Sequence, residues 1–114
     1  MDASITWEHD QTFVAEAISG FRLPIGEDEI GCRPMELLLF SLAGCTAVDV
    51  LSILQKKRQK VTGFEIRVNS DRSPEHPRRF TAITLNYIVQ GQEIDPAAVE
   101  RAIELSLTKY CSVH

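Results

Sequence analysis

A nearly continuous apolar run over residues 37–54 constrains the fold of this chain more than any other feature of its sequence. The run is long enough to cross a membrane, but Asp49 lies inside it and small polar residues dilute it. A helix at a protein surface is apolar on one side only, whereas this run is apolar almost all round. We therefore expect a central helix that protein surrounds on most sides, and no membrane as a partner.

The ends of two helices carry recognisable signals. Pro34 suits the first turn of a helix, and an acidic residue two positions later meets the positive end of the helix dipole, which predicts a helix over residues 34–60. Asp95 and Pro96 supply an N-cap and a first-turn proline, and apolar residues then recur at helical spacing. This second pattern predicts a helix that ends near Tyr110.

Five further segments favour strands, because they alternate apolar and polar residues or are rich in β-branched and aromatic side chains. They predict an N-terminal hairpin, a short third strand and a second antiparallel pair, over residues 4–9, 12–18, 21–25, 64–69 and 80–90. A hairpin thus separates the two helices, which favours an α+β fold over a doubly wound sheet. With 114 residues, the chain is expected to form a single domain over residues 1–114.

Charge and composition exclude several functional classes. The net charge is −4, whereas nucleic-acid binding needs clustered Lys and Arg, so we expect no nucleic-acid partner. Residues 1–5 have neither the cationic nor the apolar region of a secretory signal. Three widely spaced cysteines make a poor disulfide framework. We therefore expect a reducing, cytoplasmic location, where cysteines stay as thiols unless they are catalytic or sensing.

The polar residues of the central helix are concentrated on one stripe. Ser41, Cys45, Asp49 and Ser52 recur at helical spacing in an otherwise apolar cylinder. Cys45 is either a small buried hydrophobe or a thiol that lines a cleft, and spacing alone leaves both interpretations open. A bend at Gly44 would place Cys45 near a new helix N-terminus, where a thiolate is stabilised, while Asp49 would oppose this effect.

A second cysteine, Cys111, directly follows the second predicted helix. A helix C-terminus does not favour a thiolate, so Cys111 suits a resolving thiol better than an attacking one. Peroxides are reduced when a thiolate attacks one oxygen to give a sulfenic acid, which a second thiol condenses into a disulfide. Cys32, in the loop before the central helix, is interpreted as an incidental surface or packing thiol.

No metal site and no cofactor site are predicted. Cys111 and His114 could supply two ligands, but a closed zinc site needs four and no second pair has suitable spacing. The sequence has no glycine-rich phosphate loop, no nucleophile elbow and no His-Glu-x-x-His run. Nucleotide-binding, serine-hydrolase and zinc-protease functions therefore lack support.

Two regions resemble the family of OsmC and organic hydroperoxide resistance proteins. Residues 33–39, Arg-Pro-Met-Glu-Leu-Leu-Leu, and residues 43–50, Ala-Gly-Cys-Thr-Ala-Val-Asp-Val, resemble the central helix of that family. Residues 109–113, Lys-Tyr-Cys-Ser-Val, resemble the motif around its second cysteine. The resemblance is strongest over residues 33–113 and to the subgroup whose central helix starts with Pro-Met-Glu-Leu.

The resemblance implies a fold in which β-sheets pack around the long central helix. It also implies an intertwined homodimer, in which the N-terminal strands of each subunit join the sheet of the other. The expected activity is reduction of a small organic hydroperoxide, with Cys45 attacking, Cys111 resolving and a dithiol reductant restoring both thiols. Glu36 matches a glutamate of that site, although compensation of the helix dipole explains the same position.

Two departures from the family pattern bear on the site. Members with peroxidase activity place an arginine upstream of the central helix, where it stabilises the thiolate, and Ile25 falls near that place here. Arg22 and Arg33 lie close in sequence and are the candidate replacements. Family members also continue through a further strand beyond the position of His114, so a C-terminal strand is expected to be missing.

A thiol-dependent peroxidase of organic hydroperoxides is the first functional expectation. The alternative is a non-catalytic dimer that binds a small molecule or senses redox state with the same cleft, and the missing arginine favours it. A third interpretation gives both cysteines a packing role only. It predicts that alkylating reagents reach neither thiol in the folded protein.

Overall fold

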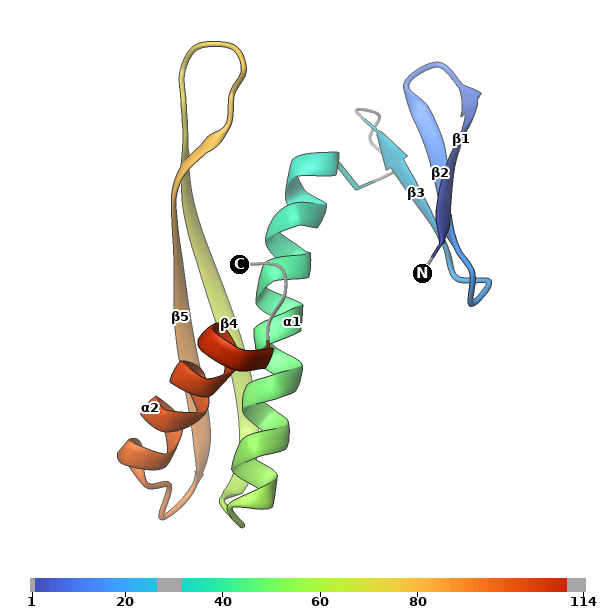
Figure 1. Ribbon diagram of the computed structural model, residues 1–114. Helices are drawn as coiled ribbons and strands as arrows, with labels where there is room; N and C mark the ends of the chain where they lie inside the picture. Colours follow the sequence, from blue (N-terminus) through green and yellow to red (C-terminus); the bar gives the residue numbers. More distant parts are fainter. Residues whose placement is uncertain (1, 27–31, 111–114) are drawn as a thin grey trace. The chain divides into compact units, whose positions relative to one another are not determined.

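The computed structural model describes residues 2–26 and 32–110 and has an α+β fold, as the order of predicted elements indicated (Figure 1). Two helices, a short π-helix and antiparallel strands follow one another along the chain. In order, they are β1 (Ala3–His9), β2 (Thr12–Ala17), β3 (Arg22–Gly26), α1 (Pro34–Lys56), β4 (Lys60–Arg72), β5 (Phe80–Gln92), α2 (Pro96–Leu105) and the π-helix η1 (Ser106–Tyr110).

The chain divides into two compact units, which we call the N-terminal unit (Met1–Phe40) and the C-terminal unit (Ser41–His114). The N-terminal unit holds the sheet β1-β2-β3 and the first turns of α1. The C-terminal unit holds the rest of α1, the hairpin β4-β5, α2 and η1. We describe each unit by itself.

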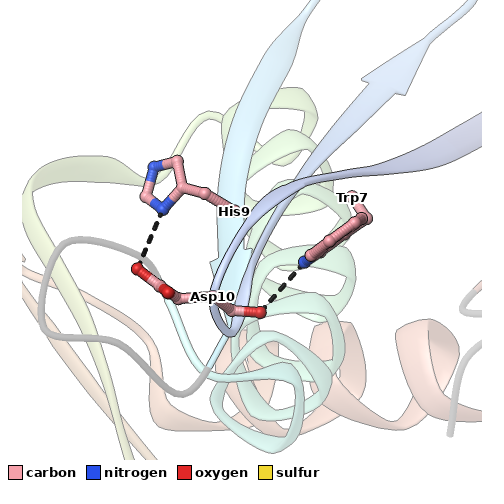
Figure 2. A network of polar contacts seen from close by, with 3 residues as sticks. All are labelled: Trp7, His9 and Asp10. Atoms are coloured by element: carbon pink, nitrogen blue, oxygen red, sulfur yellow. Dashed lines mark hydrogen bonds and ion pairs between the residues drawn. The ribbon is translucent and has the colours of Figure 1, made fainter.

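The N-terminal sheet is antiparallel and begins with the predicted hairpin. Asp10 has a φ of 45° at the turn between β1 and β2, a conformation that Asp adopts more readily than most residues. Figure 2 shows that the indole N–H of Trp7 donates to the Asp10 carbonyl over 2.9 Å, while His9 Nδ1 lies 3.5 Å from Asp10 Oδ2. These contacts fix the turn. They leave the body of Trp7 63% exposed.

Gly26 ends β3 opposite Thr12, and its φ of 158° is one that L-residues rarely adopt. A Cβ atom at this position would overlap the backbone carbonyl group of Gln11. Glycine is therefore needed for the close approach of β3 to the turn that precedes β2.

Helix α1 ends at Lys56, about a turn earlier than the predicted residue 60. The amide of Gln59 donates to the carbonyl of Leu54 over 3.0 Å, and the amide of Arg58 donates to Gln55 over 3.0 Å. With Arg58 at a φ of 58°, this is the Schellman pattern that commonly ends helices. The residue in this left-handed position is usually Gly. Here it is Arg58, so the glycine that usually marks the end of a helix is absent from the sequence at this point.

The core of the C-terminal unit lies between α1, the hairpin and α2. Val50 and Leu54 of α1 are fully buried with Ala102, and Ala98 is almost so. The surrounding partly buried side chains are Ile53, Val61, Phe64, Tyr87, Val89, Val99 and Ile103. Figure 1 shows α1 running beside the long hairpin, with α2 near the end where β4 begins and β5 ends. Both hairpin strands have 13 residues and extend beyond the predicted segments.

The second predicted helix changes character along its length. Asp95 caps α2 by accepting from the Ala97 amide over 3.0 Å, as the sequence indicated. The α-helix ends at Leu105, and the chain continues as the π-helix η1 to Tyr110. Short π-helical turns are uncommon and often mark functional sites.

The surroundings of α1 differ from the expectation that protein covers it on most sides. By length and composition α1 could cross a membrane, but a core helix of a globular protein passes the same test. Thr46, Val50 and Leu54 form one buried stripe that faces the core. Val48 remains 71% exposed. Within the C-terminal unit, the fully buried residues of α1 are therefore confined to this stripe.

Candidate functional site

Cys45 is half-buried on α1, within the C-terminal unit. The helix runs without a break through Gly44, so Cys45 does not lie at a new helix N-terminus. Gly44 itself is exposed, and a Cβ atom there would meet no atom within 4 Å. In the single chain, the surface of α1 beside the Cys45 thiol is therefore not covered by a side chain at position 44.

Of the four residues in the predicted polar stripe, two line the same hollow. Ser41 is exposed, whereas Cys45, Asp49 and Ser52 are half-buried. Asp49 and Ser52 line a hollow of about 450 Å³, the other residues of which are Ile53, Lys56, Lys57 and Leu105. Cys45 is not one of its lining residues. The hollow lies further along α1, toward the C-terminal end of the helix.

A chain of polar side chains connects three elements directly beside Cys45. Thr46 Oγ1 lies 2.8 Å from the Tyr87 hydroxyl of β5 and 2.8 Å from Ser106 Oγ, at the start of η1. Ser106 Oγ lies 3.2 Å from Asp49 Oδ2. Thr46 and Ser106 are both fully buried. These four residues, Thr46, Tyr87, Ser106 and Asp49, are called the hydroxyl network below.

Of the hydroxyl network, the sequence predicts Asp49 alone, as part of the polar stripe on the central helix. Thr46, Tyr87 and Ser106 are not among the predicted site residues. A signal was nevertheless present, because a buried hydroxyl needs a partner and Ser106 falls on the same face as Ala98 and Ala102. The hydroxyl of Tyr87 on a core-facing strand was the available partner.

Glu36, in the N-terminal unit, helps to cap the N-terminus of α1. Its Oε1 accepts a hydrogen bond from the backbone amide of Arg33 over 3.2 Å. The Arg33 carbonyl accepts from the Leu37 amide over 3.1 Å, which places Arg33 at the N-cap of α1. A glutamate three residues after the N-cap that binds the N-cap amide is one half of a capping box. Its expected part in the thiol site stays a prediction.

Of the two candidate arginines, Arg22 has a described partner for its side chain. Its Nε lies 3.3 Å from Glu16 Oε2, and the two residues are paired across β2 and β3. Both side chains are at least half exposed, at 64% and 50%. The backbone of Arg33 forms the N-cap of α1. The assignment of either guanidinium to Cys45 stays a prediction.

The other two cysteines differ in what is described. Cys32 forms a parallel bridge with Ile25, and its amide donates to the Pro24 carbonyl over 3.1 Å. These are contacts of the backbone, and the interpretation of Cys32 as an incidental surface or packing thiol stays a prediction. Cys111 lies outside the described residues, directly after the end of η1.

Comparison with known proteins gives consistent matches over nearly the whole chain. A family model described as OsmC-like protein matches residues 26–114. The chain is 44% identical to Protein YhfA of Escherichia coli K12 over 115 residues, which covers 99% of this chain and 86% of the relative. A crystal structure of a protein from Aquifex aeolicus VF5 is 37% identical, with a TM-score of 0.90 over 98% of this chain and 82% of that one. A crystal structure of an OsmC-like protein from Mycoplasma pneumoniae is 17% identical, with a TM-score of 0.83 over 99% and 83% of the two chains.

Proposed function

This chain belongs to the OsmC-like family, and we propose that it is a thiol-dependent peroxidase that reduces organic hydroperoxides through Cys45 and Cys111. The observation that carries the proposal is the setting of Cys45, which is half-buried on a continuous apolar helix beside the open surface of Gly44. Exposed Val48, three residues later, offers an apolar contact for the organic part of the substrate.

The proposed reaction has three steps. The Cys45 thiolate attacks one peroxide oxygen, the O–O bond breaks, and the leaving alkoxide takes a proton to become an alcohol. The Cys111 thiol then attacks the sulfur of the Cys45 sulfenic acid, which forms a disulfide and releases water. A dithiol reductant restores both thiols by exchange and is itself oxidised to a disulfide. A reducing cytoplasm would supply such a dithiol.

The experiment follows thiol loss in the pre-reduced protein after it is mixed with cumene hydroperoxide. We expect fast loss of two thiols per chain and a disulfide between Cys45 and Cys111. Cys45→Ser should lose no thiol quickly, whereas Cys111→Ser should stop at the sulfenic acid. Cys32→Ser is the matched control and should behave like the parent. A parent rate no faster than that of a small thiol would refute the peroxidase.

We propose further that the protein acts as a homodimer, because a single chain leaves too much apolar side chain exposed. The described large apolar residues that are at least 45% exposed come from both units: Ile5, Trp7, Ile18, Phe21, Leu38, Phe40 and Val48. Every residue of β1 is exposed. A second copy whose N-terminal strands join the sheet of the first would cover such surfaces. Sedimentation at micromolar concentration tests this, and a monomer would refute it.

One observation favours the alternative of a binding or redox-sensing dimer without turnover. Arg22 is paired with Glu16, and Glu36 caps α1, so a structural contact accounts for each of these two residues. A neighbouring guanidinium activates a thiol for attack on a peroxide, and the pairing of Arg22 with Glu16 engages one candidate elsewhere. Slow thiol loss in the cumene hydroperoxide experiment, together with specific binding of small molecules, would select this alternative.

A further inference from the structure

The hydroxyl network is a linear series of contacts between four side chains. The Ser106 hydroxyl carries one proton and lies within hydrogen-bond distance of two acceptors, Thr46 Oγ1 at 2.8 Å and Asp49 Oδ2 at 3.2 Å. Thr46 Oγ1 also lies 2.8 Å from the Tyr87 hydroxyl, and either of these two oxygens can be the donor. Thr46 and Ser106 therefore each have two partners in the network, whereas Tyr87 has one.

This series of contacts is costly to interrupt in the middle. Thr46 and Ser106 are fully buried, so water cannot replace a partner that is lost. Loss of the Thr46 hydroxyl would remove the contacts with both Tyr87 and Ser106. Loss of the Tyr87 hydroxyl would leave the two contacts of Ser106 intact.

The network joins the two chain segments that bear the proposed reactive cysteines. Thr46 directly follows Cys45, and Asp49 lies one helical turn later on the same face. Ser106 is the first residue of η1, the last residue of which directly precedes Cys111 in the sequence. The Ser106 amide also bonds the carbonyls of Ala102 and Ile103, so its backbone and side chain are both fixed.

We infer that Thr46 and Ser106 are positioning residues, which fix the start of the segment that carries Cys111 relative to the helical turn that carries Cys45. This inference rests on the proposed function and assigns the network to its second step. The network sets how readily the Cys45–Cys111 disulfide forms. The first step, the attack of Cys45 on the peroxide, does not depend on it.

The test measures the Cys45–Cys111 disulfide equilibrium of the full chain in buffers of reduced and oxidised dithiothreitol, in a Cys32→Ser background. This equilibrium reports the effective concentration of one thiol at the other and needs no peroxide. Thr46→Val keeps the shape of the side chain and removes its hydroxyl, and we expect it to lower the effective concentration roughly tenfold. Thr46→Ser keeps the hydroxyl and should restore it to within about threefold of the parent.

Two further variants separate positioning from general stability. Val50→Ala creates a cavity in the same buried stripe of α1 without touching the network, and should leave the disulfide equilibrium within about twofold of the parent. Tyr87→Phe should have a smaller effect than Thr46→Val, because it removes one contact of the network whereas Thr46→Val removes two. An equal loss in Thr46→Val and Val50→Ala would overturn the inference and leave the network a purely structural role.

Kinetics with cumene hydroperoxide complete the test. In Thr46→Val the lifetime of the Cys45 sulfenic acid, followed by trapping with dimedone, should lengthen roughly tenfold, while the rate of its formation stays within about twofold of the parent. A change in formation alone would overturn the inference. If the parent reacts slowly with the peroxide but the equilibrium contrast between Thr46→Val and Val50→Ala persists, the peroxidase fails and the positioning role stands.

Discussion

The two units of this molecule differ in what holds them together. The C-terminal unit has a core, formed by Val50, Leu54, Ala98 and Ala102. Among the described residues of the N-terminal unit, Thr12, Ile25 and Gly26 are buried, and one of these is a large apolar residue. All the exposed large apolar residues noted above except Val48 also lie in the N-terminal unit. Backbone pairing without a core is marginal in water, so we expect the N-terminal unit to depend on apolar contacts beyond its own.

This difference also divides the proposed site. Cys45 and the hydroxyl network belong to the unit with a core, and Glu36, Arg22 and Arg33 belong to the unit without one. The attacking thiol is therefore held by the fold of one chain. The charged groups that would activate it depend on whatever stabilises the N-terminal unit, which we propose is the second subunit.

The largest expected effect comes from the core of the C-terminal unit. Leu54 is fully buried, and Leu54→Ala should lower the free energy of unfolding by about 2–5 kcal/mol, because a cavity adds to the lost transfer free energy. Ile18 is 76% exposed in the single chain and lies outside the strands, so where no second subunit covers it, Ile18→Ala should change the free energy of unfolding by less than about 0.5 kcal/mol. Urea unfolding followed by circular dichroism measures both. Similar losses in the two variants would contradict the contrast between the units.

Amide hydrogen exchange sharpens the comparison directly. If a second subunit stabilises the N-terminal unit, Val48→Asp should dissociate the dimer and speed exchange in β1, β2 and β3 by about 100-fold. Amides of β4 and β5 should exchange at a nearly unchanged rate, because the C-terminal unit keeps its own core. Uniform acceleration in all five strands would show that the units unfold together and would remove the distinction.

The elements of the fold were largely predictable, because they rest on local patterns. Alternation of apolar and polar residues predicted β4 and β5, and Asp95 with Pro96 predicted the start of α2. The end of α1 was not predictable to a residue, because Arg58 occupies a left-handed position that usually takes Gly. The change from α2 to η1 begins at Ser106, the tertiary contacts of which have no local signal in the sequence.

The site was predictable to a smaller extent, because its contacts join residues far apart in the sequence. The motif around Cys45 identified the family, and the family match supports that recognition. The bonds of Ser106 with Thr46 and Asp49 span the whole C-terminal unit, and no pattern of spacing reveals them. The buried position of Ser106 on its helix face indicates a hydrogen-bond network only together with the residues opposite it, Thr46 and Asp49.

Two glycines give the next largest effects, with opposite signs. Gly26→Ala should lower the free energy of unfolding by at least about 1 kcal/mol, because the Cβ atom overlaps the Gln11 carbonyl group and the φ of 158° disfavours alanine. Gly44→Ala in the helix should raise it by up to about 1 kcal/mol, since a Cβ atom there meets nothing in the single chain.

Thermal unfolding of the two variants checks these signs. A stable Gly44→Ala protein that also reacts more slowly with cumene hydroperoxide would support access to Cys45 across Gly44. A Gly44→Ala protein that is destabilised and monomeric would instead place the partner subunit against that glycine.

The smallest effect on stability is expected at Glu36, where two roles can be separated. Glu36→Gln keeps an oxygen that accepts from the Arg33 amide, so the half capping box survives without its charge. Glu36→Ala removes both and should cost about 0.5–1 kcal/mol of unfolding free energy. If Glu36 also orients or modulates the Cys45 thiolate, Glu36→Gln should slow the reaction with cumene hydroperoxide by roughly tenfold at nearly unchanged stability.

Arg22→Gln is the matched control for this prediction within the same unit. Its ion pair with Glu16 is exposed, so its loss should change the free energy of unfolding by less than about 0.5 kcal/mol. Peroxide rates that fall in Glu36→Gln but not in Arg22→Gln would assign the charge requirement to the glutamate. Equal rates in the parent, Glu36→Gln and Arg22→Gln would mean that Glu36 serves α1 alone, and that the N-terminal unit gives the thiol no electrostatic help through either residue.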